Sequence, residues 1–440
     1  MELKEKILSS FLAFEQTIDI KSDIHKVRSN AIKDFEKVGL PTKKMEAWKY
    51  TSLTKVLDKE YTLLSAQNTV SNTIDYQDIE PYLIKDMDTY TIVFVDGVYH
   101  AQFSQTTHDT FDICLLSSAL SNNKYKPVLD VYFNQIAPSE NMVTLNTAFT
   151  SEGAYIYIPK NVAVHKPVQI LHITTGKNTS QLIQPRNLIV VEDNSEISII
   201  ERHQNLSENR ALSNAVTEMY VGKNSHVNYY KIQNDTEKSS LIDNTFIKQL
   251  SNSVCGVHTF SFGGEVVRNN LNFYQDGNAI DSILNGVTVI EGKTHIDHNT
   301  LVAHNTPNCE SHQNYKGIFN DKSTGVFNGK IIVDKIAQKT NAFQSNNNIL
   351  LSDKATVNSK PQLEIFADDV RCSHGCTIGQ LDKDALFYLK SRGIPQKEAS
   401  ALLTYAFAGE VLEEVKLPKL KKRINTLIAQ KLGVEIGFDI

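Results

Sequence analysis

The 440-residue sequence is poor in cysteine, in basic charge and in long apolar runs. Its five cysteines do not suggest a disulfide framework and indicate a reducing compartment. A net charge of −5 lacks the basic excess that a nucleic-acid-binding surface needs. No apolar run approaches the roughly 18 residues of a membrane-spanning helix. We therefore expect a soluble cytoplasmic protein that binds neither nucleic acid nor membrane.

Motifs of several common enzyme classes are also missing. The sequence has no Walker A loop, no Rossmann glycine pattern and no G-x-S-x-G elbow. If nucleotide hydrolysis matters to this protein, another subunit must perform it. The first 20 residues mix acidic and basic side chains with apolar ones, which is typical of neither a signal peptide nor a transit peptide.

Periodicity divides the chain into three regions, as expected for a length beyond that of a single core. Residues 1–141 are predicted to be mostly helical, with a strand at Tyr90–Val95. The tryptophan Trp48 is expected to anchor a loop to a helix. Residues 142–379 consist of short β-rich runs, and residues 380–440 return to helical periodicity. The last helices are predicted to close the end of the core or to dock a partner helix.

The middle region favours a parallel β-helix. A polar turn followed by an alternating strand recurs along it, and two such units begin at Glu192 and Gly222, 30 residues apart. Repeats of this kind bury their apolar faces by stacking on their neighbours. The asparagine-rich segment Asn341–Asn348 suits polar ladders at the turns. A β-sandwich is the alternative, but roughly 240 residues of short strands is long for one sandwich.

Residues 367–379 carry the densest set of metal-ligand side chains. Cys372, His374 and Cys376 alternate there, and cysteine and histidine bind soft or borderline metals and Fe–S clusters. In an extended strand the three would share one face, which favours a site that a partner surface completes. The alternative is a small buried thiol pair beside a solvated histidine, because free cysteine usually packs in a core.

A second candidate metal site surrounds residues 294–298. Asp297 and Cys309 could join histidine in binding zinc. Four histidines lie in or after this segment: His295, His298, His304 and His312. On a strand, however, the first two would point to opposite faces. Solvated strand histidines are therefore the preferred interpretation.

The adjacent carboxylates Asp368 and Asp369 raise the alternative of a solitary β-helix enzyme that acts on polysaccharide. Glycosidases need two carboxylates about 5–10 Å apart in different environments. Neighbours on a strand point apart, and an extracellular enzyme would normally carry a signal peptide. The residues therefore disfavour this alternative.

Ordered motifs along nearly the whole chain resemble the SufB/SufD family of SUF iron–sulfur cluster assembly scaffolds, and within it the SufD branch. They are Glu46–Leu53, Leu145–Phe149 with Tyr155–Pro159, His304 to Ser311 with Lys316–Gly317, Ala367–Gly375, and Ser391–Ile394 with Phe407. The resemblance implies a mainly β protein, with a right-handed parallel β-helix between N- and C-terminal helical regions. It also implies a non-catalytic scaffold subunit.

The resemblance further implies partners and cofactors. A SufB-like subunit would pair through the β-helices, and the ABC ATPase SufC would dock on the C-terminal helices at Tyr388, Arg392, Ile394 and Phe407. The implied cofactors are a transient iron–sulfur cluster at the SufB interface, ATP through SufC, and reduced flavin on the complex. A homodimer is a further assembly to consider for the isolated chain.

Carried over to this sequence, the family's interface residues are His374, with Cys372 beside it, as transient ligands of iron or a cluster. Cys376 would be an auxiliary or structural thiol. The alternative within the same family is a purely architectural subunit that stabilises SufB and SufC without supplying a ligand.

Overall fold

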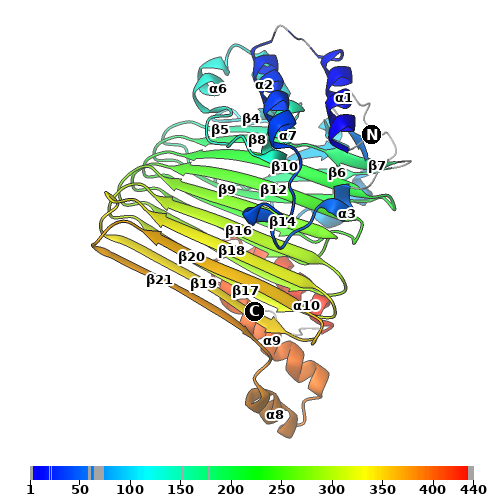
Figure 1. Ribbon diagram of the computed structural model, residues 1–440, viewed down its shortest axis with the longest axis vertical. Coiled ribbons are helices and arrows are strands. Elements are labelled where there is room, and N and C mark those ends of the chain that lie inside the picture. Colours follow the sequence, from blue (N-terminus) through cyan, green and yellow to red (C-terminus); the bar gives the residue numbers. More distant parts are fainter. Residues whose placement is uncertain are drawn as a thin grey trace.

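A two-sheet β-solenoid forms the body of the protein in the computed structural model, which describes residues 3–18, 20, 22–57, 61–63, 74–150, 152–176 and 179–434. Strands alternate between the two sheets along the chain, so each coil contributes one strand to each sheet (Figure 1). Strands of successive coils pair in parallel, for example Val254 with Asp281 and Glu310 with Asn341. The predicted parallel β-helix is thus confirmed.

Sheet A contains, in spatial order, β4 (Asp112–Leu115), β5 (Ala154–Ile158), β8 (Arg186–Val191), β10 (Ala211–Val221), β12 (Ser239–Gln249), β14 (Val266–Gln275), β16 (His295–His304), β18 (Thr324–Val333) and β20 (Thr356–Ile365). Two short strands, β1 (Tyr61–Leu63) and β7 (Ser180–Ile183), extend it beside β10. Sheet B contains β3 (Val98–Tyr99), β2 (Tyr90–Val95), β6 (Val168–Thr174), β9 (Glu196–Asn205), β11 (His226–Gln233), β13 (Val254–Ser261), β15 (Asp281–Ile290), β17 (Glu310–Phe319), β19 (Thr340–Leu350) and β21 (Val370–Gly379).

The solenoid interior is filled by every second residue of each strand. Ile189 and Met219 of sheet A meet Ile199 and Val227 of sheet B in one buried cluster. Residues between them point outward, where helices cover parts of both sheets. The early strands β6 and β8, which are buried along their whole length, are mostly apolar, as expected of strands covered on both faces.

Asparagines stack at one corner of the solenoid, where the backbone adopts positive φ. Asn161, Asn194, Asn224 and Asn252 have φ between 56° and 64°, a conformation that asparagine tolerates better than most residues. The side-chain amides of Asn194, Asn224 and Asn252 each donate to the side-chain oxygen of the asparagine in the preceding coil, at 2.8–3.0 Å. The prediction that Asn341–Asn348 forms such a ladder at the turns is wrong, because that segment forms the extended strand β19.

N-terminal helices cover the outer face of the early strands of sheet A (Figure 1). α1 (Leu3–Glu15), α2 (Asp23–Val38) and α7 (Asn141–Ala148) provide apolar residues that cluster with those of the sheet. Shorter helices of this region are α3 (Thr54–Leu57), α4 (Tyr76–Ile79), α5 (Leu116–Ser121), α6 (Lys126–Tyr132) and three 3-10 turns, Glu46–Trp48, Glu80–Tyr82 and Ala101–Phe103. The strand predicted at Tyr90–Val95 is confirmed as β2, which joins sheet B.

Trp48 contacts the solenoid, which modifies the expectation that it anchors a loop to a helix. The guanidinium of Arg268 on β14 lies 3.9 Å from the centroid of its ring. Nearby, the Thr51 hydroxyl bonds to Asp297 on β16, and Lys360 on β20 pairs with Glu46 at 2.5 Å. The segment from Glu46 to Thr51 therefore holds the N-terminal region against β14, β16 and β20 of sheet A.

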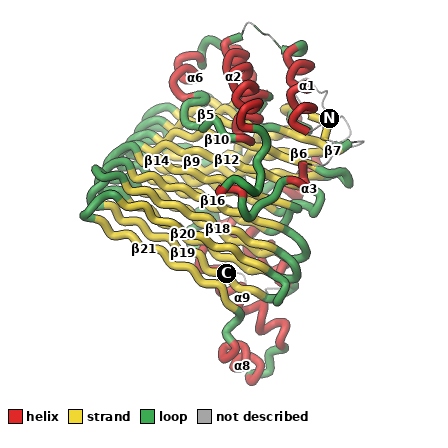
Figure 2. Tube along the Cα trace, viewed as in Figure 1, coloured by secondary structure: helices red, strands yellow, loops and turns green. Residues whose placement is uncertain are grey.

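Three C-terminal helices follow the last strand: α8 (Lys383–Ser391), α9 (Gln396–Leu412) and α10 (Pro418–Leu432). α9 and α10 pack on the outer face of sheet B, where Val411 and Ile424 join Tyr230 and Phe260 in one cluster. α8 projects beyond β21, away from the solenoid (Figures 1 and 2). Asp382 caps the start of α8, since its side chain accepts from two backbone amides. No helix in the described ranges has the length and apolar character to cross a membrane.

Candidate functional site

Cys372, His374 and Cys376 lie on β21, the last strand of sheet B, so the predicted strand is confirmed. Cys372 is the register partner of Ala342 on β19, and both belong to a cluster with Leu363 of the facing sheet. Cys372 therefore points into the solenoid. Because side chains alternate along a strand, His374 and Cys376 point the same way. We call these three residues the ligand row.

The final coil, formed by β20 and β21, is the open end of the solenoid. Within the described ranges, no strand pairs with the outer edge of either strand. A Cβ placed on Gly375 or Gly379 would meet no atom within 4 Å. Apolar side chains are exposed there, including Ile365, Ile378 and Phe366, the last 63% exposed. Unpaired edges beside exposed apolar surface form a template on which another chain can add.

The ligand row does not form a chelating set by itself. Alternate residues on a strand are roughly 6.5–7 Å apart, whereas zinc ligands bind at about 2.0–2.3 Å. No metal-binding group that includes this row occurs in the part of the chain that the structure describes. Cys372 is half-buried, and burial raises the pKa of its thiol, while His374 and Cys376 are exposed. An ion or cluster held here needs further ligands from outside this chain.

The layer beneath the ligand row is polar. Gln344 and Asn346, the register partners of His374 and Cys376, are buried. The Ser359 hydroxyl on β20 donates to Asn346 Oδ1 at 2.8 Å. Gln344 Oε1 is buried and has no hydrogen-bond partner among the described residues. A free acceptor oxygen thus lies one strand away from His374, inside the mouth of the solenoid.

Two of the four histidines of the second candidate site are buried in the interior, which corrects the expectation of solvated side chains. His298 Nε2 lies 3.0 Å from the Thr288 hydroxyl, and His304 Nε2 lies 2.9 Å from the Ser311 hydroxyl. Burial lowers the pKa of each imidazole to about 4. Both are therefore neutral, hydrogen-bonded parts of the core.

The zinc interpretation of the same segment is not supported. His295 points to the outer face, as alternation predicted, but it is largely buried with its Nε2 2.8 Å from the Thr51 hydroxyl. Asp297 pairs with Arg268 at 2.5 Å, and the Cys309 thiol bonds to backbone oxygens. The side chain of His312 is 45% exposed. These residues form no metal-binding group within the described ranges.

The carboxylates Asp368 and Asp369 lie in the exposed turn before β21, so their expected position on a strand is wrong. The Asp369 amide donates to Gln338 Oε1 at 2.8 Å, and its carbonyl accepts from the Lys339 amide. The backbone of Asp369 therefore helps to hold the turn between two coils.

The four residues expected to dock a partner ATPase occupy two environments. Tyr388 and Arg392 are exposed at the end of α8, with the guanidinium 6.0 Å from the ring centroid. Ile394 is half-buried. Phe407 on α9 packs toward the solenoid, and the Lys316 ammonium on β17 lies 4.7 Å from its ring centroid. Of these four residues, only Tyr388 and Arg392 are exposed and away from the solenoid.

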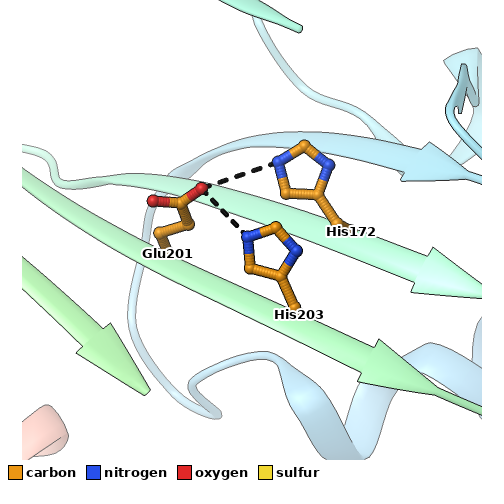
Figure 3. Close-up of side chains that lie close together, drawn as sticks. All are labelled: His172, Glu201 and His203. Atoms are coloured by element: carbon orange, nitrogen blue, oxygen red, sulfur yellow. Dashed lines mark hydrogen bonds and ion pairs between the residues drawn. The ribbon is translucent and has the colours of Figure 1, made fainter. Parts of the chain in front are cut away.

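A further cluster, which sequence reasoning missed, lies inside the early coils (Figure 3). His172 on β6 and His203 on β9 are register partners, and their rings stack with centroids 4.5 Å apart. Both imidazoles face the carboxylate of Glu201, two residues before His203. Ligand atoms of the three lie within 4.8 Å of one another, a grouping found nowhere else in the described ranges. The signal that could have revealed it is the coil repeat, which aligns His172 with His203.

Two family models match consecutive parts of the chain. One, described as SUF system FeS cluster assembly, SufBD core domain, matches residues 172–407, which is more than half of the sequence. The chain belongs to the SufBD family. The model of the SufBD protein N-terminal region matches residues 1–170. The family predicted from the motifs is therefore confirmed, and the SufBD core match takes in both the ligand row and the His172 cluster.

Individual SufBD relatives match along most of the sequence. An iron–sulfur cluster assembly SufBD family protein of Synechocystis is 32% identical over 399 residues, 89% of this chain and 87% of that protein. Iron–sulfur cluster assembly protein SufD of Escherichia coli is 30% identical over 399 residues, 90% of each chain. SufD of Bacillus subtilis is 26% identical over 423 residues, 92% and 93% of the two chains. This SufBD chain is thus a scaffold component of SUF iron–sulfur cluster assembly.

Proposed function

We propose that this chain pairs at its open end with a SufB-like solenoid and that the ligand row faces the space where a transient iron–sulfur cluster forms. The observation that carries the proposal is the placement of Cys372, His374 and Cys376 on the inner face of the last, unpaired coil. Thiolate and imidazole are suitable iron ligands. Because of the spacing of these residues along β21, each side chain of the row can supply one bond to iron or to a cluster. The other ligands would come from the partner.

The two free edges explain how such a partner would attach. A strand added to β20 or β21 would satisfy unpaired backbone groups and cover Ile365, Phe366 and Ile378. Pairing would also convert the ligand row from an exposed edge into an enclosed, low-dielectric site. His374 and Cys372 are the proposed cluster contacts, and Cys376 is an auxiliary thiol of the same site.

We further propose that this chain is a non-catalytic subunit and that a SufC-like ATPase binds through α8. Tyr388 and Arg392 present a ring and a guanidinium on a helix that stands clear of the solenoid. α9 connects this helix to sheet B through Phe407 and the ion pair between Lys316 and Glu410. Movement of α8 driven by ATP would therefore reach β17, which is two strands from the ligand row in sheet B. Reduced flavin would be a cofactor of the assembled complex.

Co-expression with the SufB-like and SufC-like proteins tests this assembly. With a tag on this chain, we expect the SufB-like and SufC-like proteins to co-purify with it under anaerobic conditions. Phe366→Lys places a charge on the exposed open end and should abolish co-purification of the SufB-like chain while the ATPase is retained. Leu12→Lys, at an exposed position on α1, is the matched control and should change nothing. Absence of the SufB-like chain from the wild-type sample would refute the proposed function, and its retention by the Phe366 variant would refute the interface.

A further inference from the structure

The His172–Glu201–His203 cluster has unmet bonding capacity. His172 Nε2 is buried without a hydrogen-bond partner among the described residues, and it lies 3.7 Å from Glu201 Oε1. That distance is too long for a hydrogen bond, which needs about 2.7–3.2 Å. His203 Nε2 lies 3.3 Å from the same oxygen. Two nitrogens and one oxygen thus converge on a single point (Figure 3).

The charges around this point do not balance. Glu201 and Asp243 are buried carboxylates, and Lys231 is the ammonium between them, 2.6 Å from Asp243 Oδ2 and 3.9 Å from Glu201 Oε2. Two anions and one cation leave a negative charge in the interior, and an uncompensated buried charge is strongly unfavourable. A cation bound beside Glu201 would balance this charge.

We propose that His172, Glu201 and His203 bind one divalent transition-metal ion, of the class of Fe²⁺ or Zn²⁺, at a site separate from the ligand row. Two imidazoles and one carboxylate are a recurrent ligand set for these ions, with water in the remaining positions. All three residues are buried, which favours a retained ion over one in rapid exchange. This inference goes beyond the proposed function, because it concerns an ion held by this chain alone.

Neighbouring residues hold the carboxylate in the orientation that such a site needs. Asn187 Nδ2 donates to Glu201 Oε1 at 3.3 Å, and the Tyr229 hydroxyl donates to Oε2. His172 is stacked between His203 and Phe94, whose ring centroid lies 4.9 Å away. Neighbouring groups that fix the orientation of a ligand side chain in this way raise the metal affinity of a site. The side chain of His203 is 9% exposed, compared with 2% for His172 and 3% for Glu201.

Metal binding can be tested on the full chain with the ligand row removed. In a Cys372→Ser, His374→Ala, Cys376→Ser background, the protein is incubated anaerobically with Fe²⁺ or with Zn²⁺ alone, desalted and analysed for metal. We expect one ion per chain with at least one of the two metals. His172→Asn and Glu201→Gln should each weaken binding about 10–100-fold or more. His226→Asn, at an exposed position on β11, is the control and should bind normally.

A stability measurement guards against variants that simply fail to fold. An ion that binds only the folded chain raises the melting temperature with increasing metal concentration. We expect this rise in the background protein and its loss in the Glu201→Gln variant, whose circular dichroism should remain unchanged. Binding of zinc but not iron would support the proposal and identify the ion. Absence of binding with both metals would refute it, and so would unchanged binding in both cluster variants.

Discussion

At the residue scale, the members of the ligand row differ in their surroundings. Cys376 is exposed at the edge of the last coil, whereas Cys372 is half-buried beside Leu363 and burial raises the pKa of its thiol. The thiolate is both the nucleophile and the metal ligand. In the isolated chain, Cys376 is therefore the more available thiol, and Cys372 gains thiolate character only when a cation or donor approaches it.

We predict that a maleimide at neutral pH modifies Cys376 first, Cys372 more slowly and the fully buried Cys255 only after unfolding. Peptide mass spectrometry over a time course measures the three rates. In complex with the SufB-like chain, both thiols of the row should become protected. Cys114, half-buried on β4 far from the open end, should react equally in both samples. Equal labelling of Cys376 with and without the partner would contradict the proposed interface.

Buried neutral histidines predict acid sensitivity. Burial lowers the pKa of His304 from 6.5 to about 4, so between these values the unfolded chain binds a proton that the folded chain does not. Stability should fall as pH decreases through this window, by up to about 2 kcal/mol from this residue between pH 7.5 and 5. His304→Gln should lose less stability than wild type over this range in urea unfolding. His226→Gln, at an exposed site, should behave as wild type, and an equal loss in all three would contradict the assignment.

At the scale of elements, the asparagine corner stabilises the stacking of coils. Asn224 has φ 56°, donates to Asn194 and accepts from Asn252. Asn224→Ala should cost about 2 kcal/mol, because alanine is strained at positive φ and both bonds are lost. Asn224→Gly should cost less, since glycine relieves the backbone strain. Urea unfolding measures both variants, and an equal cost would show that the backbone conformation contributes nothing.

α8 is the element whose exposed residues are expected to serve a partner rather than the fold. Tyr388 is 60% exposed, so Tyr388→Ala should change stability by no more than about 0.5 kcal/mol. It should nevertheless weaken binding of the SufC-like ATPase by about 2 kcal/mol, or roughly 30-fold, if the ring is an interface anchor. Isothermal titration calorimetry measures this change. Tyr76→Ala, 52% exposed on α4, should leave the affinity unchanged, and equal affinities for all three proteins would remove Tyr388 from the interface.

Elements set by local signals could be predicted from the sequence. The helix over residues 418–432 and the cap at Asp382 depend on spacing and capping within a few residues. The shared face of the ligand row likewise depends only on the period of a strand. The burial of His298 could not be predicted, because it depends on which face of β16 turns inward. The proximity of His172 to His203 depends on the exact length of a coil, which irregular spacing concealed.

At the scale of the whole molecule, the two ends of the solenoid differ. Among the residues that the structure describes, N-terminal helices cover the early coils, whereas the last coil ends in unpaired strand edges and α8 projects past it (Figure 1). Solenoids normally need a cap at each end, because a terminal coil exposes apolar surface. The unpaired edges of β20 and β21 in the described residues, the ligand row on the same coil and membership of the SufBD family together support a partner at this end. The division into regions 1–141, 142–379 and 380–440 stays a prediction.

The most direct test of the central proposal is an anaerobic count of iron and acid-labile sulfide on the complex with the SufB-like and SufC-like proteins. Wild type is compared with His374→Ala and with His312→Ala, a half-exposed histidine on β17 that lies outside the ligand row. We predict that the three-protein complex stays intact in all samples and that only the His374 variant loses its cluster. Full loading of that variant would contradict the proposal and make this chain an architectural subunit, with the chemistry on its partner.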